Sequence, residues 1–362
     1  MPGTVHRLTR SYGSIPAGQL VIHQPGGQPT PQPESDPLRR TFLLVHAHDT
    51  AAVGVDAMAT EAQRSYEGVL LFNDVISQAS QISSPWFLRT DAPYPRWWRT
   101  QNPTVRRRFV VTQAPMVGTD AASVISGSLD SAITSCLAAI RTAFGDQAIV
   151  RLGHEANTHG AQYPWGNTRT SAADYKAVWR RWVNLARAGG FPFQFEFTSM
   201  LDGTPLADWY PGDDIVDIVG LDAYGSKWKS TNPSESELVA WVKTQAPNSI
   251  EDLTAFCASH NKPFAFSEWS MFSWQKPLTN ASGAAVSDSR GSGDHASYVD
   301  AIFDTIAAYP VTSGSNVYCA YHSLWNVGDG GVGTTLEGRD GSLAMPNIRA
   351  RYYQRVRALH PA

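Results

Sequence analysis

The stretch from residue 148 to residue 199 contains a strand–helix–strand unit that indicates how the chain folds. It opens with the apolar run Ala148-Ile-Val-Arg-Leu-Gly153 and closes with a second run, Phe193-Gln-Phe-Glu-Phe-Thr-Ser199. Between the runs, Ala172–Ala188 carries apolar residues three to four positions apart, which is typical of an amphipathic helix: Tyr175, Val178, Trp179, Trp182 and Leu185. Two strands joined through a helix predict parallel pairing.

The same alternation continues in both directions along the chain. The predicted strands are Thr41–Ala47, Val69–Asp74, Arg108–Gln113, Ala148–Gly153, Phe193–Ser199, Ile215–Asp222, Pro263–Glu268 and Val317–Ser323. A further helix is predicted over Ala121–Phe144. Eight strands with intervening helices predict an α/β protein, a (β/α)8 TIM barrel built as a single domain. An open, doubly wound sheet is the alternative, but no Gly-rich phosphate-binding motif follows the first strand.

The N-terminal part of the chain differs in composition from the rest. Five prolines fall between Pro25 and Pro37, interleaved with Gln, Gly and Thr, a pattern that favours extended, unpacked chain. We therefore expect residues 1–39 to form a short N-terminal extension with a Pro-rich linker, and residues 40–362 to form the barrel domain. The first 24 residues lack the apolar core expected of a signal peptide.

Composition narrows the range of partners. With 29 basic and 32 acidic residues the net charge is -3, which argues against a nucleic-acid or anionic membrane partner. Apolar runs stay well short of the ~18 residues that a membrane span needs. The three cysteines, Cys136, Cys257 and Cys319, are far apart and lack metal-ligand spacing, so we expect buried free thiols. We also expect a monomer.

Two glutamates stand at strand ends where a barrel of this kind places its active site. Glu155 follows the predicted fourth strand and Glu268 ends the seventh. These strands lie on opposite sides of an eight-stranded barrel, so their side chains can converge across its mouth. Glycoside hydrolysis needs two carboxyl groups flanking the scissile bond, and retaining enzymes hold them about 5–5.5 Å apart. The sequence therefore predicts Glu155 and Glu268 as a catalytic pair.

A metal-dependent hydrolase is the main alternative. His46-Ala-His48, at the end of the first strand, is the spacing of the first ligand pair in amidohydrolase barrels. That chemistry also needs His ligands after the fifth and sixth strands, where this sequence has none. We therefore predict no metal and no organic cofactor, and interpret His46 as a sugar contact or a core residue.

Four segments resemble glycoside hydrolase family 26, the β-mannanase family of clan A. The first is Arg151-Leu-Gly-His154-Glu155-Ala-Asn157 with Tyr163-Pro-Trp165-Gly166, similar to the acid/base signature of the family. The others are Tyr210–Tyr224, similar to its sixth strand, Lys262-Pro-Phe-Ala-Phe-Ser-Glu268-Trp269, similar to its nucleophile strand, and Trp325-Asn326. They occur in the family's order and span residues 40–330 or so.

The resemblance implies a retaining β-glycoside hydrolase with Glu155 as acid/base, Glu268 as nucleophile and a polysaccharide as partner. It also implies residues that bind the sugar or hold the nucleophile. Some of these residues could instead only pack or pair inside the barrel. Tyr224 is expected to donate its hydroxyl to Glu268, and Arg151 either to hold that carboxylate or to form a buried structural salt bridge. The remaining predicted contacts are His154, Asn157, Trp165, Trp269 and Trp325.

Two departures from the family pattern bear on the substrate. The segment between Asn157 and Tyr163 is longer than in the family and lacks an aromatic residue, and the fifth strand ends without the Trp of the mannanase cleft. A β-1,4-mannan is the expected substrate. The alternatives are another microbial cell-wall or capsular glycan, as for a phage tail or lysin module, and a barrel that binds carbohydrate without cleaving it.

Overall fold

The computed structural model describes most of the chain from residue 40 onward. The described residues are 40–47, 51–74, 76–88, 108–159, 163–224, 233–271, 278–279, 285–286, 293–327, 334–336 and 343–360. The N-terminal extension predicted for residues 1–39 lies outside these ranges.

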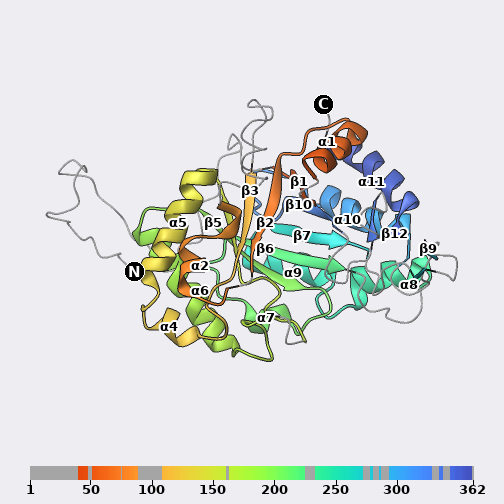
Figure 1. Ribbon diagram of the computed structural model, residues 1–362. Helices are drawn as coiled ribbons and strands as arrows, with labels where there is room; N and C mark the ends of the chain where they lie inside the picture. Colours follow the sequence, from red (N-terminus) through yellow and green to blue (C-terminus); the bar gives the residue numbers. More distant parts are fainter. Residues whose placement is uncertain are drawn as a thin grey trace.

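Eight parallel strands close into a barrel in the order β1-β10-β7-β6-β5-β4-β3-β2 (Figure 1). They are β1 (Phe42–Ala47), β2 (Gly68–Asn73), β3 (Arg108–Gln113), β4 (Ile149–Leu152), β5 (Gln194–Met200), β6 (Ile218–Tyr224), β7 (Phe264–Ser270) and β10 (Cys319–Asn326). Each overlaps a predicted strand, so the prediction of a (β/α)8 barrel is confirmed. Outside the barrel, β8 (Leu278–Thr279) pairs with β9 (Ala285–Val286), and β11 (Thr334–Thr335) with β12 (Leu343–Ala344).

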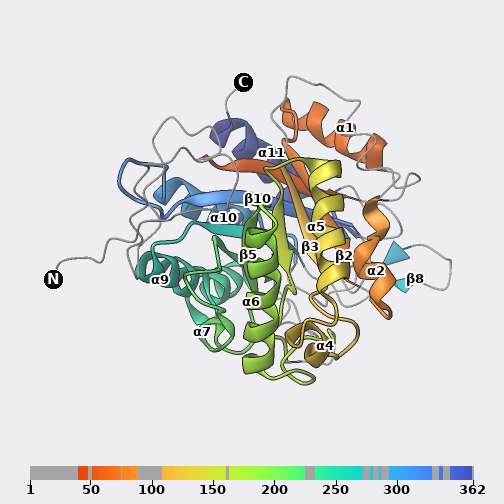
Figure 2. The same ribbon diagram turned by 90° about the vertical axis from the view of Figure 1, so that its left-hand side faces the viewer.

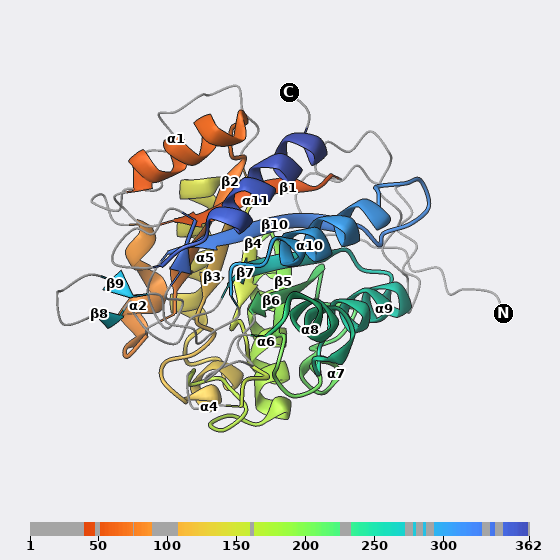
Figure 3. The ribbon, with the colours of Figure 1, turned by 90° about the vertical axis from the view of Figure 1, so that its right-hand side faces the viewer.

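Helices surround the barrel. They are α1 (Ala51–Ala62), α2 (Ala79–Ser83), α4 (Ala121–Ile125), α5 (Asp130–Phe144), α6 (Ala172–Ala188), α7 (Leu206–Trp209), α8 (Glu235–Ala240), α9 (Ile250–His260), α10 (Ala296–Ala308) and α11 (Pro346–Leu359). The described residues also contain a 3-10 turn, η1 (Trp86–Leu88), and a π-helical turn, η2 (Trp241–Gln245). Figure 2 shows α5 and α6 side by side, and Figure 3 shows α10 beside α11 on another side of the barrel.

The two helices predicted from periodicity have different outcomes. Helix α6 has the predicted bounds and follows the N-cap Ser171. Its predicted apolar stripe is buried except for Leu185, which is half-buried. The single helix predicted over Ala121–Phe144 is wrong, because the structure divides it into α4 and α5. Gly127, between them, has a φ of +90°, a left-handed conformation that glycine adopts readily and an α-helix cannot accommodate.

The barrel interior changes from apolar to polar along the strands. The apolar end is filled by Phe42, Leu44, Leu70, Val110, Ile149 and Ile218, among others. Two residues closer to the carboxyl end of the same strands, the inward side chains are polar. Thr112 follows Val110 on β3, and Arg151 follows Ile149 on β4. Apolar side chains therefore pack one end of the barrel, and the chemically active groups gather at the carboxyl ends.

All three cysteines are free and buried, as predicted. Among the described residues, no helix is both long and apolar enough to cross a membrane.

Gly220 on β6 leaves room for the polar groups inside the barrel. A Cβ at this position would lie 2.2 Å from Ser267 Oγ, 2.5 Å from Glu196 Oε1 and 2.9 Å from Thr198 Oγ1. We predict that Gly220→Ala lowers the free energy of unfolding in urea by roughly 3 kcal/mol, because the interior cannot accept the extra methyl group. Ser267→Ala removes the nearest atom and should restore part of the loss; an unchanged free energy in Gly220→Ala would contradict this packing.

Candidate active site

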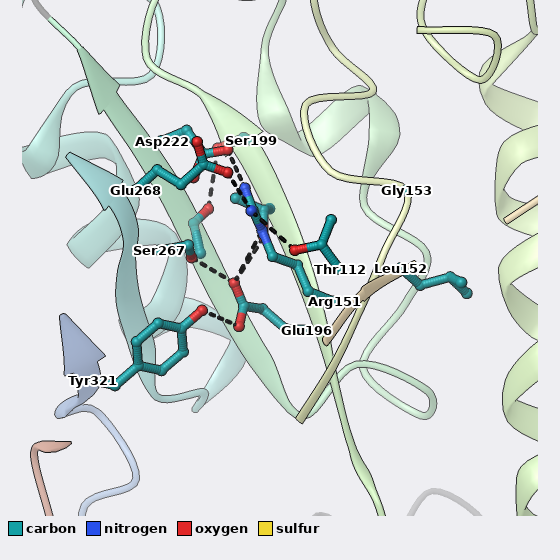
Figure 4. A network of polar contacts seen from close by, with 12 residues as sticks. Thr112, Arg151, Leu152, Gly153, Glu196, Ser199, Asp222, Ser267, Glu268 and Tyr321 are labelled. Carbon is teal, nitrogen blue, oxygen red and sulfur yellow. Dashed lines mark hydrogen bonds and ion pairs between the residues drawn. The ribbon is translucent and has the colours of Figure 1, made fainter. Parts of the chain in front are cut away.

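Arg151, on β4, is fully buried and is the cation at the centre of the site. Its guanidinium donates to the carboxylates of Asp222 and Glu268, and also to Thr198 Oγ1 at 3.0 Å and Thr112 Oγ1 at 3.3 Å (Figure 4). Burial disfavours the charge, but the carboxylates more than offset this effect and raise the pKa of Arg151 well above its ordinary value. Arg151 therefore remains charged and ties β4 to β6 and β7.

Glu196, on β5, lies beneath this cluster. Its Oε1 is 3.8 Å from Arg151 Nε and accepts hydrogen bonds from Thr198 and Ser267, while Tyr321 donates to its Oε2 at 2.5 Å (Figure 4). Three carboxylates thus surround one guanidinium. Burial, with the charges of Glu268 and Glu155 against that of Arg151, raises the pKa of Asp222 well above its ordinary value.

Glu268, on β7, has both carboxylate oxygens engaged. Arg151 donates to Oε1, and the Tyr224 hydroxyl donates to Oε2 at 2.8 Å. Contacts from two different strands fix the orientation of the carboxylate, and the expected hydrogen bond from Tyr224 is present.

Glu155 lies in a strained turn directly after β4. Its φ is +50°, a left-handed value that non-glycine residues seldom adopt, and Gly153 two residues earlier has a φ of +58°. Several hydrogen bonds maintain the turn. The Glu155 amide donates to Thr198 O at 3.1 Å, and the Trp165 indole donates to His154 O at 2.7 Å. The surrounding structure therefore imposes the conformation, as is common where a side chain must point into a functional site.

The electrostatic environment of Glu155 differs from that of Glu268. Burial, and then the negative charge of Glu268, raises the pKa of Glu155 to about 8, against the opposing effect of Arg151. Asp202 raises this pKa further, and a hydrogen bond from the Tyr163 side chain lowers it. Glu268 is close enough to affect the pKa of Glu155. The predicted separation of about 5–5.5 Å between the two carboxyl groups stays a prediction.

His154 lies beside Glu155 and is neutral. Burial, followed by the charge of Arg151, lowers the pKa of His154 well below its ordinary value. The ring is packed between aromatic neighbours, with centroids 4.4 Å from Tyr163 and 5.7 Å from Phe72. The buried Nδ1 has no hydrogen-bond partner among the described residues.

An aromatic group forms part of the mouth around Trp325, which is partly exposed at the end of β10. Its ring centroid lies 4.1 Å from that of His46, 5.4 Å from Phe72 and 6.4 Å from Tyr224. His46 Nδ1 hydrogen-bonds Leu70 O at 3.0 Å, which fixes the imidazole against the indole. One cluster thus brings His46, Tyr224 and Trp325 together.

Three of the predicted substrate contacts occupy buried positions, where they contact other parts of the protein. Trp269 is fully buried and faces away from the barrel axis, toward Tyr298 and Phe303 of α10. Its neighbour Glu268 points inward, and successive side chains of a strand point to opposite faces. Trp165 is 1% exposed, and the ring of Tyr163 is stacked on it.

Asn157 is the third of these buried residues. It is fully buried, and its amide is used by backbone groups: it donates to Met200 O and Thr204 O and accepts from Met200 N. Asn157 therefore joins the turn after β4 to the loop after β5.

Some residues of the site were not predicted from the sequence. Phe72 contacts His46, His154 and Trp325, but one apolar residue in an apolar strand resembles core. Glu196 was also missed, although a glutamate inside the run Phe193–Ser199 is a signal, since a charge buried in a strand needs partners. Its partner Tyr321 lies 125 residues further along the chain, and nothing in the sequence around Tyr321 indicates this contact.

Within the described ranges, no group of three or more His, Cys, Asp or Glu side chains is placed to hold a metal ion. His48, half of the pair considered as metal ligands, lies outside the described residues.

Replacing Arg151 should show how far the site depends on it. We predict that Arg151→Met lowers the free energy of unfolding by about 3–5 kcal/mol, because buried carboxylates lose their cation. The loss should be larger at pH 8 than at pH 5, since the carboxyl groups of the variant can take up protons at the lower pH.

Arg181→Met is a suitable control, because Arg181 pairs with Asp130 at the surface, where its side chain is 37% exposed. Such pairs contribute under about 1 kcal/mol. Chemical denaturation at both pH values measures the difference, and equal losses in the two variants would contradict a special role for Arg151.

Comparison with known proteins agrees with this geometry. The pattern of the family described as Glycosyl hydrolase family 26 matches residues 90–285, more than half of the chain. Endoglucanase H of Acetivibrio thermocellus is 32% identical over an alignment of 122 residues, and the match covers 29% of this chain and 13% of that protein. This chain therefore matches only a small part of that relative.

Solved structures share the fold at low sequence identity. An endo-beta-1,4-mannanase from Cellulomonas fimi has a TM-score of 0.57 at 16% identity, covering 86% of this chain and 70% of that one. The catalytic domain of a GH26 endo-beta-1,4-mannanase from Bacillus sp. JAMB-750 has a TM-score of 0.55 at 16% identity, covering 88% and 87%. Because the family match covers more than half of the chain, the chain belongs to glycosyl hydrolase family 26.

Proposed function

We propose that this enzyme hydrolyses a β-linked polysaccharide with retention of configuration, using Glu268 as nucleophile and Glu155 as acid/base. The observation that carries the proposal is the contrast between the two glutamates. Arg151 and Tyr224 hold both oxygens of Glu268, whereas burial and the charge of Glu268 raise the pKa of Glu155 to about 8. Two carboxyl groups in one site, one prepared to donate a proton and one oriented by two hydrogen-bond donors, suit double displacement.

In the first step, the Glu268 carboxylate attacks the anomeric carbon. The glycosidic C–O bond breaks, and the Glu155 proton passes to the leaving oxygen. This step leaves a glycosyl ester on Glu268 and a carboxylate on Glu155. The hydrogen bond from Tyr224 keeps the second oxygen of Glu268 in place during the attack.

In the second step, Glu155 acts as a base. Its carboxylate takes a proton from water, the water oxygen attacks the anomeric carbon, and the ester bond to Glu268 breaks. The product keeps the β configuration, and both glutamates return to their starting states. The direction of the pKa shift of Glu155 suits this double role, because a group that titrates near neutrality can both give and take a proton.

For the substrate we propose a β-1,4-mannan. The similar solved structures from Cellulomonas fimi and Bacillus are described as endo-beta-1,4-mannanases, which supports this choice of polymer. We propose that the face of Trp325 opposite His46 stacks on a sugar ring, since flat aromatic rings match the apolar faces of sugars. His154 and His46 are the proposed polar contacts beside it.

A glucan is the second candidate, because the sequence relative is named an endoglucanase. A panel of mannan, mixed and uniform β-glucans and bacterial cell-wall polymers, assayed for new reducing ends, separates these substrates. Release from mannan alone is the expected result, and release from another polymer alone would replace mannan in the proposal.

The two glutamates can be separated by chemical rescue. Glu155→Ala should still form the glycosyl ester from an aryl β-glycoside with a good leaving group, because nitrophenolate needs no proton, and should then stall. Azide should resolve the stalled ester to a β-glycosyl azide. Glu268→Ala should lack the first step on all substrates, and azide should give the α-product. NMR of the anomeric configuration identifies the azide product of each variant.

The reverse pattern, a retained azide from Glu268→Ala and an inverted one from Glu155→Ala, would exchange the two roles. Unchanged rates of both variants on the polymer would place the active site elsewhere.

The pKa of Glu155 predicts the pH dependence of the reaction. Glu155 must be protonated to act as the acid, and its pKa is about 8, so kcat/KM should hold below pH 8 and fall about tenfold per pH unit above it. The measurement is kcat/KM between pH 5 and pH 10. Glu155→Gln, assayed on an activated aryl glycoside, should lose this limb, and persistence of the limb would assign it to another group.

A further inference from the structure

Glu196, on β5, is a fully buried charged residue that the reaction as described so far does not use. Its Oε1 accepts hydrogen bonds from Thr198 Oγ1 at 2.8 Å and from Ser267 Oγ. Its Oε2 accepts a hydrogen bond from the Tyr321 hydroxyl at 2.5 Å, so the carboxylate lies between β7 and β10 side chains (Figure 4). All three partners are donors, which suits a buried carboxylate, and they fix both of its oxygens.

Thr198 connects Glu196 to the guanidinium of Arg151. A hydroxyl group has one proton, and Thr198 donates this proton to Glu196 Oε1. The same hydroxyl oxygen can then only accept from Arg151, whose Nε donates to it at 3.0 Å. Arg151 Nε lies 3.8 Å from Glu196 Oε1, too far for a direct hydrogen bond. Glu196 therefore acts on Arg151 mainly through the Thr198 hydroxyl.

The position of Nε determines where the other N–H groups of Arg151 point. The guanidinium is planar, and its five N–H bonds form a rigid fork. With Nε held at Thr198, Nη1 donates to Glu268 Oε1 and Nη2 donates to Asp222 Oδ2. A rotation of the plane would turn the Nη1 N–H away from Glu268. The hydrogen bond at Nε therefore helps to orient the carboxylate of Glu268.

The need for a counter-ion does not explain why Glu196 is buried here. Arg151 carries one positive charge and already donates to the carboxylates of Asp222 and Glu268. A third carboxylate adds negative charge to a group that already has an excess. Burial chiefly raises the pKa of Asp222, and the charge of Glu196 is among those that add to this effect. Orientation of the guanidinium gives Glu196 a role that charge balance does not.

We propose that Glu196 is a positioning residue for the nucleophile: through the Thr198 hydroxyl it fixes the guanidinium of Arg151 in the orientation that directs one N–H at Glu268. The inference rests on the proposed function, in which Glu268 is the nucleophile. It assigns to a residue beneath the site an effect on the first step, the attack of Glu268 on the anomeric carbon.

Two substitutions test the proposal at different points. Thr198→Val keeps the branched side chain and removes only the hydroxyl. Glu196→Gln keeps the shape of the side chain and removes the charge that strengthens the hydrogen bond from Thr198. Thr198→Val leaves every charge of the cluster in place, so it decides the outcome if Glu196→Gln does not fold.

The first measurement is kcat/KM for phenyl and 2,4-dinitrophenyl β-mannobioside. Each variant should lower kcat/KM about tenfold, and by a similar factor for both substrates, because attack by Glu268 is needed whatever the leaving group. Glu155→Gln provides the contrast: its loss should be much larger for the phenyl glycoside, since only phenolate needs a proton to depart.

The second measurement needs no substrate. In enzyme labelled with 15N at arginine, the Arg151 Nε–H signal is identified by its absence from Arg151→Lys. Loss of the hydrogen bond to Thr198 should shift this signal and make its proton exchange with water about tenfold faster in Thr198→Val. Glu196→Gln should change the signal in the same direction.

Thr254→Val is the matched control. Thr254 is buried on α9, outside the barrel, and its hydroxyl donates to Ile250 O at 3.0 Å. The substitution removes a buried threonine hydroxyl in the same way as Thr198→Val. It should change neither kcat/KM nor the Arg151 Nε–H signal.

Failure of the proposal can be told apart from failure of the proposed function. If Glu268→Ala keeps full activity on the polymer, Glu268 is not the nucleophile and both are overturned. If Glu268→Ala is inactive while Thr198→Val keeps kcat/KM and the Nε–H signal, or loses only stability in urea, the proposal for Glu196 is overturned. A loss that is larger for the phenyl glycoside would place the effect on Glu155 and would also overturn it.

Discussion

The buried guanidinium of Arg151 is the interaction on which the rest of the site depends. One cation is shared among Asp222, Glu196 and Glu268, and each of these carboxylates would be costly to bury alone. The cluster links four strands of the barrel, β4 to β7, at the level where the interior changes from apolar to polar. Gly220 is part of the same arrangement, because only a residue without a side chain leaves room for these groups.

The cluster also makes the two candidate catalytic glutamates different. Arg151 donates a hydrogen bond to Glu268, whereas on the pKa of Glu155 the charge of Glu268 has a larger effect than the charge of Arg151. A position on the left-handed turn after β4 separates Glu155 from the cation, and α6 buttresses that turn through Tyr175, whose hydroxyl donates to Gly153 O at 2.8 Å. Backbone geometry is therefore what places similar carboxyl groups in unlike environments.

Aromatic residues in this molecule either line the mouth of the barrel or pack in its interior and walls, and the sequence does not distinguish the two roles. Trp325, with His46 behind it, remains partly exposed at the mouth, where it can meet a ligand. Trp165 and Trp269 are buried and act as supports, one beneath Tyr163 and the other between β7 and α10. The difference comes from the direction of each side chain relative to the barrel axis.

The sequence by itself determined the eight-strand pattern, the barrel and the position of two glutamates at the carboxyl ends of the fourth and seventh strands, because periodicity and strand order are local properties. The alternation of side chains along a strand also predicts that Trp269 points away from the barrel interior, since its neighbour Glu268 points inward. Only the tertiary structure decided the rest. The partnership of Glu196 with Tyr321, separated by 125 residues, depends on ring closure, which brings β10 within reach of β5 side chains across the barrel. The division of the predicted helix at Gly127 likewise depended on packing, because glycine permits a left-handed turn without requiring one.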